Sequence, residues 1–289
     1  MSLESLFKGS PNLPNIPKVV QELIKQFNDP HSNVDEISKK IQMDQVLSAK
    51  IMRLANSARY GAGRKIASID SAVVMLGIDT LKTLVVASGI TGAFQDIPGF
   101  DKKQFWRDSF MIASISKLIA KHTDSDPETA FTIGMMRNIG ELLIHIYHEE
   151  SAVKIDKLVE SGANRIDLQD NQFGYDFTQA GSELAKRWNF PTEIVNGIRQ
   201  QAAPNDFEEY SAYSSIVYLA DYLNEAFKAE QEKQEILSQF PVDIAKPIDI
   251  NLVSFFEGLG LELGLRFWVV QLIALHMDET SYVSLGYGF

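Results

Sequence analysis

Residues 134–143 read GMMRNIGELL, with Arg137 and Asn138 between Met136 and Ile139. A guanidinium has no lone pair to give to a cation, and a carboxamide offers only a weak neutral oxygen. Imidazole and carboxylate groups are strong ligands for divalent metals, and this dipeptide supplies neither. The expected function of the chain depends on whether these two positions can bind a metal.

The surrounding sequence has helical rather than strand periodicity. Between Gln104 and Lys121, five residues follow one another at three- and four-residue spacing, which places them on one face of a helix. They are Phe105, Asp108, Ile112, Ile115 and Ile119. Asn33, Asp44 and Ser68 precede other helical segments, and their side-chain oxygens can accept from the free amides of a first turn. Alternating strands with two-residue glycine turns are scarce. We predict an all-α protein.

Four further segments narrow this prediction: NLPNIP (12–17), DQVLSAKIMRLANSARYG (44–61), IDSAVVMLG (69–77) and RWNFP (187–191). Together with residues 134–143 they resemble the HDOD domain family over most of residues 12 to 230. HDOD domains are bacterial all-helical signalling modules related to HD and HD-GYP phosphohydrolases, usually without a complete metal site. The resemblance implies a multi-helix fold in which an N-terminal helical subdomain packs on a degenerate HD-like bundle.

The resemblance also implies where the metal ligands of the HD hydrolases would have been. Their adjacent His-Asp pair reads Arg137-Asn138 here, their upstream His falls at Asp108, and their last ligand survives as Asp221. Their later His positions fall near Phe177 and within 199–202, where no residue is His. We expect a vestigial pocket formed by the side chains at the first four of these positions: Asp108, Arg137, Asn138 and Asp221.

Two roles are open for Arg137. Enclosed carboxylates need a cation, since an unpaired buried charge costs several kcal/mol. The guanidinium could take the place of the metal by bridging Asp108 or Asp221 with its planar fork. Alternatively, Arg137 points to solvent and pairs with Glu141 one turn later.

A weak metal candidate lies on the following helix. Glu141, His145 and His148 share one face at i, i+4 and i+7. A physiological site normally adds ligands from a second element. We therefore assign no metal and no cofactor to the chain. We assign Trp106 and Trp188, on helical stripes, to packing.

The most basic region could receive an acidic partner or a phosphate. It carries Arg53, Asn56, Arg59, Arg64 and Lys65, and glycines punctuate it. The same pattern suits a helix C-terminal cap and turn, so the structural interpretation stands beside the binding one.

Composition limits the partners. The formal net charge of -11 opposes binding to nucleic acid or an anionic membrane. The absence of Cys excludes disulfides, thiolate zinc sites and cysteine nucleophiles. The N-terminus lacks the pattern of a secretory signal. We expect a cytoplasmic protein whose partners are proteins.

Three regions are predicted. Residues 1–98 form the HDOD-specific subdomain, which ends at the Pro98-Gly99 turn, residues 99–230 the HD-like bundle, and residues 231–289 a helical extension packed on the bundle. That extension includes a helical pair at about 251–277.

The predicted function is signal transduction without catalysis, through contacts in trans with a kinase, a response regulator or motility components. One retained aspartate cannot hold the metal that lowers the pKa of a hydrolytic water. The alternatives are a metal-dependent phosphohydrolase of nucleotides or cyclic dinucleotides, and a sensor that holds a small anion or nucleotide near Arg137.

Overall fold

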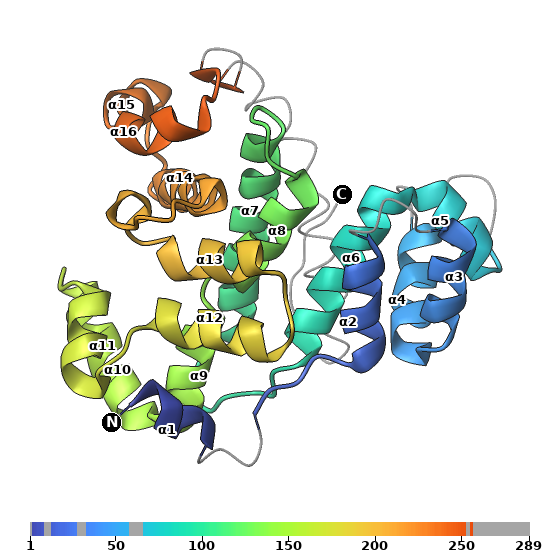
Figure 1. The fold of residues 1–289 in the computed structure, drawn as a ribbon, viewed down its shortest axis with the longest axis horizontal. Coiled ribbons are helices and arrows are strands. Elements are labelled where there is room, and N and C mark those ends of the chain that lie inside the picture. Colours follow the sequence, from blue (N-terminus) through green and yellow to red (C-terminus); the bar gives the residue numbers. More distant parts are fainter. Residues whose placement is uncertain (1, 9–12, 28–32, 58–65, 253–254, 257–289) are drawn as a thin grey trace, which may run out of the picture.

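The structure is a computed structural model that describes residues 2–8, 13–27, 33–57, 66–252 and 255–256 (Figure 1). These residues form helices and no strand, which confirms the all-α prediction. The helices, in chain order, are α1 (Leu3–Lys8), α2 (Lys18–Phe27), α3 (Val34–Gln42), α4 (Gln45–Ala55), α5 (Ile69–Leu76), α6 (Ile78–Gly92), α7 (Lys102–Ala120), α8 (Pro127–Met136), α9 (Ile139–Tyr147), α10 (Glu149–Glu160), α11 (Arg165–Phe173), α12 (Phe177–Arg187), α13 (Thr192–Gln200), η1 (Pro204–Asp206), α14 (Ala212–Lys228), α15 (Lys233–Ser238), α16 (Val242–Ala245) and η2 (Lys246–Ile248).

Side-chain caps start the helices where the sequence predicts them. The Asn33 side chain accepts from the Asp35 amide, Asp44 caps α4, and Ser68 caps α5. Each cap satisfies one of the amides that a first turn leaves free. The three predicted start signals are confirmed.

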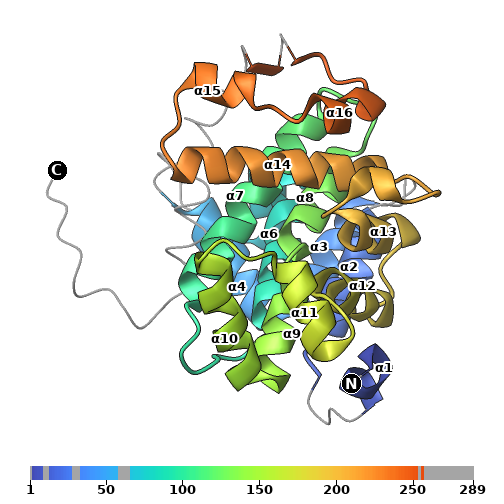
Figure 2. The same cartoon turned by 90° about the vertical axis from the view of Figure 1, so that its left-hand side faces the viewer.

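Helices α7 and α8 run through the middle of the molecule (Figures 1 and 2). Helices α2–α6 lie on one side of them, and α6 contacts α8. On the other side α14 packs along α7, and α15, α16 and η2 lie beyond it. Helices α9–α13 complete the bundle at the end where the α8–α9 turn lies.

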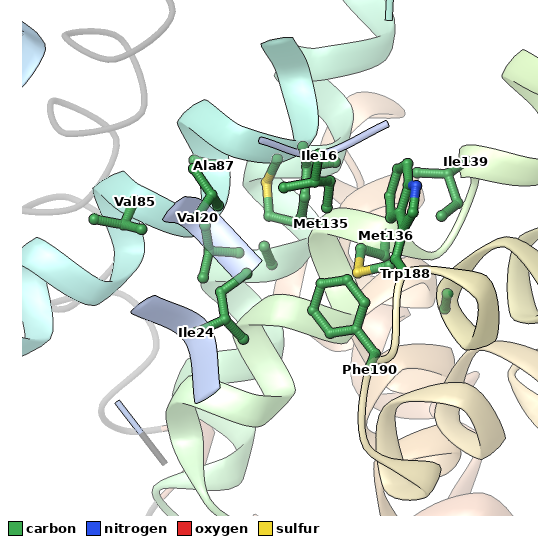
Figure 3. Close-up of a cluster of buried hydrophobic side chains, with 14 of the residues drawn as sticks. Ile16, Val20, Ile24, Val85, Ala87, Met135, Met136, Ile139, Trp188 and Phe190 are labelled. Atoms are coloured by element: carbon green, nitrogen blue, oxygen red, sulfur yellow. The ribbon is translucent and has the colours of Figure 1, made fainter. Parts of the chain in front are cut away.

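A single apolar core joins the N-terminal helices to the bundle. Figure 3 shows Val20 of α2 and Met135 and Met136 of α8 in one cluster with Trp188 and Phe190. The Trp188 indole also donates to the Pro14 carbonyl at 2.9 Å. The predicted boundary at residue 98 therefore does not divide the core, although it coincides with a turn at Gly99, whose φ is +73°.

The structure also bears on the predicted packing of the two tryptophans and of the C-terminal extension. Trp106 and Trp188 are 5% and 4% exposed, so their assignment to the core is confirmed. A second apolar cluster joins α7 and α14 to α15, α16 and η2, which places the described part of the C-terminal extension on the bundle. Most of the predicted pair at 251–277 lies outside the described residues.

Length and hydropathy also decide whether a helix can span a bilayer. None of the described helices is, by itself, both long and apolar enough to do so. Helices α5 and α6 meet those limits only when taken together, across a bend of 111°.

The stretch 134–143 does not form one helix. Helix α8 ends at Met136 and α9 begins at Ile139, so Arg137 and Asn138 form a turn between them. Close packing of α9 on α12 fixes this geometry. A Cβ on Gly140 would lie 1.9 Å from the carbonyl oxygen of Phe177 and 2.8 Å from the amide nitrogen of Gly181.

Replacing Gly140 with Ala is expected to lower the free energy of unfolding by about 3 kcal/mol, because two backbones must separate to admit the methyl group. Gly92→Ala is the matched control, since a methyl group added at Gly92 would meet no described atom within 4 Å. Alanine there should leave stability unchanged or raise it by up to about 1 kcal/mol. Urea unfolding of both variants measures the difference, and equal effects would contradict the close approach of α9 and α12.

Candidate functional site

Arg137 is enclosed at the turn between α8 and α9, with 8% of its surface exposed. Its Nη1 forms an ion pair with the Asp221 carboxylate, which α14 supplies from 84 residues along the chain. Gln201, just after α13, donates from Nε2 to the Arg137 carbonyl at 2.7 Å. Of the two roles open from the sequence, the structure places Arg137 against an aspartate of the vestigial pocket.

Asp108 does not join this pair, which corrects the expectation that four residues converge. Its carboxylate accepts from Lys228 Nζ at 3.0 Å and from Gln104 Nε2 at 2.9 Å. Lys228 lies on α14 two turns after Asp221, so one helix presents both a carboxylate and an ammonium group to its neighbours. Each aspartate thus has its own cation, and Asp108 does not need the guanidinium of Arg137.

A second charged cluster lies beside Arg137. Arg165 Nη1 donates to Glu141 at 3.0 Å and to Asp156 at 2.7 Å. Gln169 Nε2 lies 3.1 Å from both carboxylate oxygens of Glu141. Burial raises the pKa of the Glu141 carboxyl, while Arg165 and Gln169 act in the opposite direction. Glu141 is therefore committed to Arg165 and Gln169 and does not pair with Arg137.

His145 completes this cluster, and its two contacts favour the protonated ring. Its Nδ1 lies 2.8 Å from the Glu141 carbonyl oxygen and its Nε2 lies 2.8 Å from Asp156 Oδ2. Both partners only accept, so both ring nitrogens must carry protons to satisfy them. Burial of the ring lowers the pKa of His145, but the hydrogen bonds to Asp156 and the Glu141 carbonyl raise that pKa by more.

Each side chain of the weak metal candidate, Glu141, His145 and His148, has another partner in the structure. His145 uses both ring nitrogens as donors, and His148 Nε2 lies 2.8 Å from the Tyr175 hydroxyl oxygen. The His148 ring also stacks on Phe173 with centroids 4.7 Å apart. Across the ranges that the structure describes, no group of three His, Cys, Asp or Glu side chains could hold a metal ion.

A cavity of about 220 Å³ lies between the two charged groups. Its polar lining consists of Arg137, Asn138, Glu141, His145, Asp156 and Arg165. Two side-chain atoms of these residues, Arg137 Nε and Asn138 Oδ1, are buried within the protein and have no hydrogen-bond partner among the described residues. Phe177, near which the family resemblance implies a His of the HD hydrolases, lines the cavity too.

The basic N-terminal region is described only in part. Asn56 accepts from the Ile66 amide at 2.8 Å and donates to the Ile66 carbonyl at 2.9 Å, so its side chain ties residues 56 and 66 together. This contact supports the structural interpretation of Asn56. Arg53 is exposed on α4, while Arg59, Arg64 and Lys65 lie outside the described residues. A binding role for the region stays a prediction.

Several residues of the site were missed from the sequence. Asp156, Arg165 and Gln169 come from α10 and α11, and Gln201 and Lys228 come from more distant elements. No local motif marks any of them. Only the former His positions within 199–202 pointed toward Gln201.

Comparisons with known proteins agree with the all-helical fold. Residues 13–204 match the family model of the HDOD domain. A crystal structure from Shewanella amazonensis SB2B, which carries a provisional phosphohydrolase name, is 33% identical with a TM-score of 0.80 and matches 96% of this chain and 97% of its own. An HDOD domain protein with unknown function from Geobacter sulfurreducens is 23% identical, with a TM-score of 0.77 and coverage of 96% and 97%.

A third structure extends the comparison. A protein from Marinobacter aquaeolei VT8 with a provisional signal-transduction name is 18% identical, with a TM-score of 0.74 over 95% of this chain and 60% of its own. The chain spans about half the length of the curated relatives that it matches, 50% of one and 44% of another.

The charge of His145 is expected to make stability depend on pH. Its pKa is raised on folding, so its contribution is fully present below the unfolded pKa of about 6.5 and is lost as pH rises through the folded pKa. The free energy of unfolding of the wild type minus that of His145→Gln should therefore fall above about pH 6.5, by at most about 1.4 kcal/mol per pH unit. Urea unfolding at a series of pH values measures this difference.

His148→Gln is the matched control with the opposite sign. Burial lowers the pKa of His148, so its contribution is present at higher pH and is lost as pH falls below about 6.5. Differences of the same sign for both variants would contradict the cationic assignment of His145.

Proposed function

The chain belongs to the HDOD domain family, and on this premise we propose that it is a non-catalytic signal-transduction module that acts through protein–protein contacts. The observation that carries the proposal is the ion pair of Arg137 with Asp221. A guanidinium balances the charge of the one retained HD ligand, as a metal would, but it offers no coordination position at which water could be bound and deprotonated.

The second charged cluster supports the same proposal. Hydrolysis needs a base that is free to take a proton from water. Glu141 and Asp156 both pair with Arg165, and His145 already carries protons on both ring nitrogens. Each of these candidate bases near Arg137 is therefore engaged within the protein.

An exposed apolar surface is available for a protein partner. Met43 is 80% exposed, Val46 66% and Val74 80%, and we call these three residues the α3–α5 edge. The Gln42 side chain lies 3.4 Å from Asp70, one turn before Val74, so the ends of α3 and α5 adjoin here. Large apolar side chains this exposed near adjoining helix ends favour protein association. Partners of the classes expected from the sequence, such as a kinase, a response regulator or motility components, would contact this edge in trans.

The alternative is a phosphohydrolase of nucleotides or cyclic dinucleotides, which the provisional name of the Shewanella relative favours. We expect no release of phosphate or nucleotide above the protein-free rate with Mg²⁺, Mn²⁺ or Fe²⁺, because Arg137 takes the position beside Asp221 that a metal would need. Product analysis with nucleoside phosphates and cyclic dinucleotides measures this. Turnover that disappears in Asp221→Asn would overturn the non-catalytic proposal.

Protein contact is tested directly in the cells that produce the chain. A photo-crosslinking amino acid at Val74 should yield a covalent adduct with another protein, identified by mass spectrometry. The same amino acid at Val242, an apolar residue that is 55% exposed on α16, is the matched control and should yield none. The absence of an adduct at Val74, or equal adducts at both positions, would contradict the role of the α3–α5 edge.

A further inference from the structure

We infer that Met43 is a site of reversible oxidation, at which a peroxide converts the thioether to a sulfoxide and thereby weakens protein contact at the α3–α5 edge. The inference rests on the proposed function, because it adds a chemical signal that controls the contact proposed there. The signal acts on the surface of the molecule and not on the pocket beside Arg137.

Thioethers supply all the sulfur of this chain. Its sequence has eight Met and no Cys, so no thiol of its own competes for an oxidant. Met43 is 80% exposed, whereas Met135 and Met136 are fully buried in the core. The other described methionines are partly buried against apolar clusters: Met52, Met75 and Met111. Among the methionines that the structure describes, Met43 is therefore the one that a dissolved oxidant reaches most readily.

The position of Met43 is fixed by the helices on either side of it. Its amide donates to the Lys40 carbonyl at 3.2 Å, at the end of α3. The next residue, Asp44, caps α4 by accepting from the Leu47 amide at 2.8 Å. Ile41 and Leu47 are 0% and 2% exposed, so buried side chains anchor the chain just before and just after this turn. The exposure of Met43 therefore belongs to the folded state and not to a frayed end.

The oxidation transfers one oxygen atom from hydrogen peroxide to the thioether. A lone pair on the sulfur attacks a peroxide oxygen, so that an S–O bond forms and the O–O bond breaks. The sulfur is oxidised by two electrons and the peroxide is reduced, and a proton shift between its two oxygens releases one water. Methionine sulfoxide reductases, one for each sulfoxide epimer, reverse the step with electrons from thiols. The modification is therefore reversible, as a switch requires.

A sulfoxide at Met43 changes the binding surface and leaves the core intact. Methionine suits binding surfaces because it is flexible and apolar, and the sulfoxide is polar. Met43 lies three residues before the exposed Val46, and its neighbour Gln42 lies 3.4 Å from Asp70, one turn before Val74. A partner that covers Met43 must remove the sulfoxide oxygen from water, which costs affinity unless a new hydrogen bond replaces that water.

Peptide mapping by mass spectrometry tests the chemical part of the inference. When the full chain is treated with hydrogen peroxide, Met43 should be oxidised at least about tenfold faster than Met135 and Met136, which are buried. At the dose that oxidises Met43 alone, urea unfolding should give the same free energy as for untreated protein. Oxidation of Met135 or Met136 before Met43, or a loss of stability with Met43 alone oxidised, would overturn the inference.

Photo-crosslinking from Val74 tests the effect on protein contact. In cells given a pulse of hydrogen peroxide, the yield of the Val74 adduct should fall about tenfold. In Met43→Leu, which has no sulfur at this position, the yield should be the same with and without peroxide. Met75→Leu removes the partly buried methionine next to Val74 and is the matched control, in which peroxide should still lower the yield. An equal response of the two variants to peroxide would overturn the inference.

Met43→Gln places a polar amide at the same position and needs no oxidant. Its adduct yield from Val74 should be about tenfold lower than that of Met43→Leu. Equal yields from these two variants would overturn the inference and leave the proposed contact standing. The absence of any adduct from the untreated protein would instead overturn the contact itself, and the inference with it.

Discussion

The ion pair of Arg137 with Asp221 is the interaction on which the chemistry of this protein depends. It joins the turn between α8 and α9 to α14, across 84 residues of sequence. A buried guanidinium needs a counter-charge, and removing the partner of such a charge is costly. The pair therefore stabilises the turn, and under the proposed function its guanidinium takes the place of a metal.

The same turn connects the pocket to the rest of the fold. Met135 and Met136, just before Arg137, lie in the core cluster that reaches α2 and α6 (Figure 3). Gly140, just after it, allows α9 to pack against the backbone of α12. A displacement of Arg137 would therefore disturb packing against the N-terminal helices on one side and against α12 on the other.

Local features of the fold could be predicted from the sequence, and long-range partners could not. The caps at Asn33, Asp44 and Ser68 depend on contacts within three residues, so the sequence predicts them correctly. The partner of Asp108 is Lys228, 120 residues away, and helical periodicity contains no information about that pairing. His145 was expected on a helix face with His148, yet Asp156 from the next helix determines its charge. The break between α8 and α9 falls at Arg137 and Asn138, where neither a glycine nor a proline marks it in the local sequence.

The metal content of protein purified without chelators, determined by elemental mass spectrometry beside an Asp221→Ala variant, tests the central claim most directly. If the guanidinium of Arg137 takes the place of a metal, both proteins should contain far less than one iron, manganese or zinc ion per chain. A stoichiometric metal in the wild type that is lost in the variant would contradict the account, because Asp221 would then be a ligand and not the partner of Arg137.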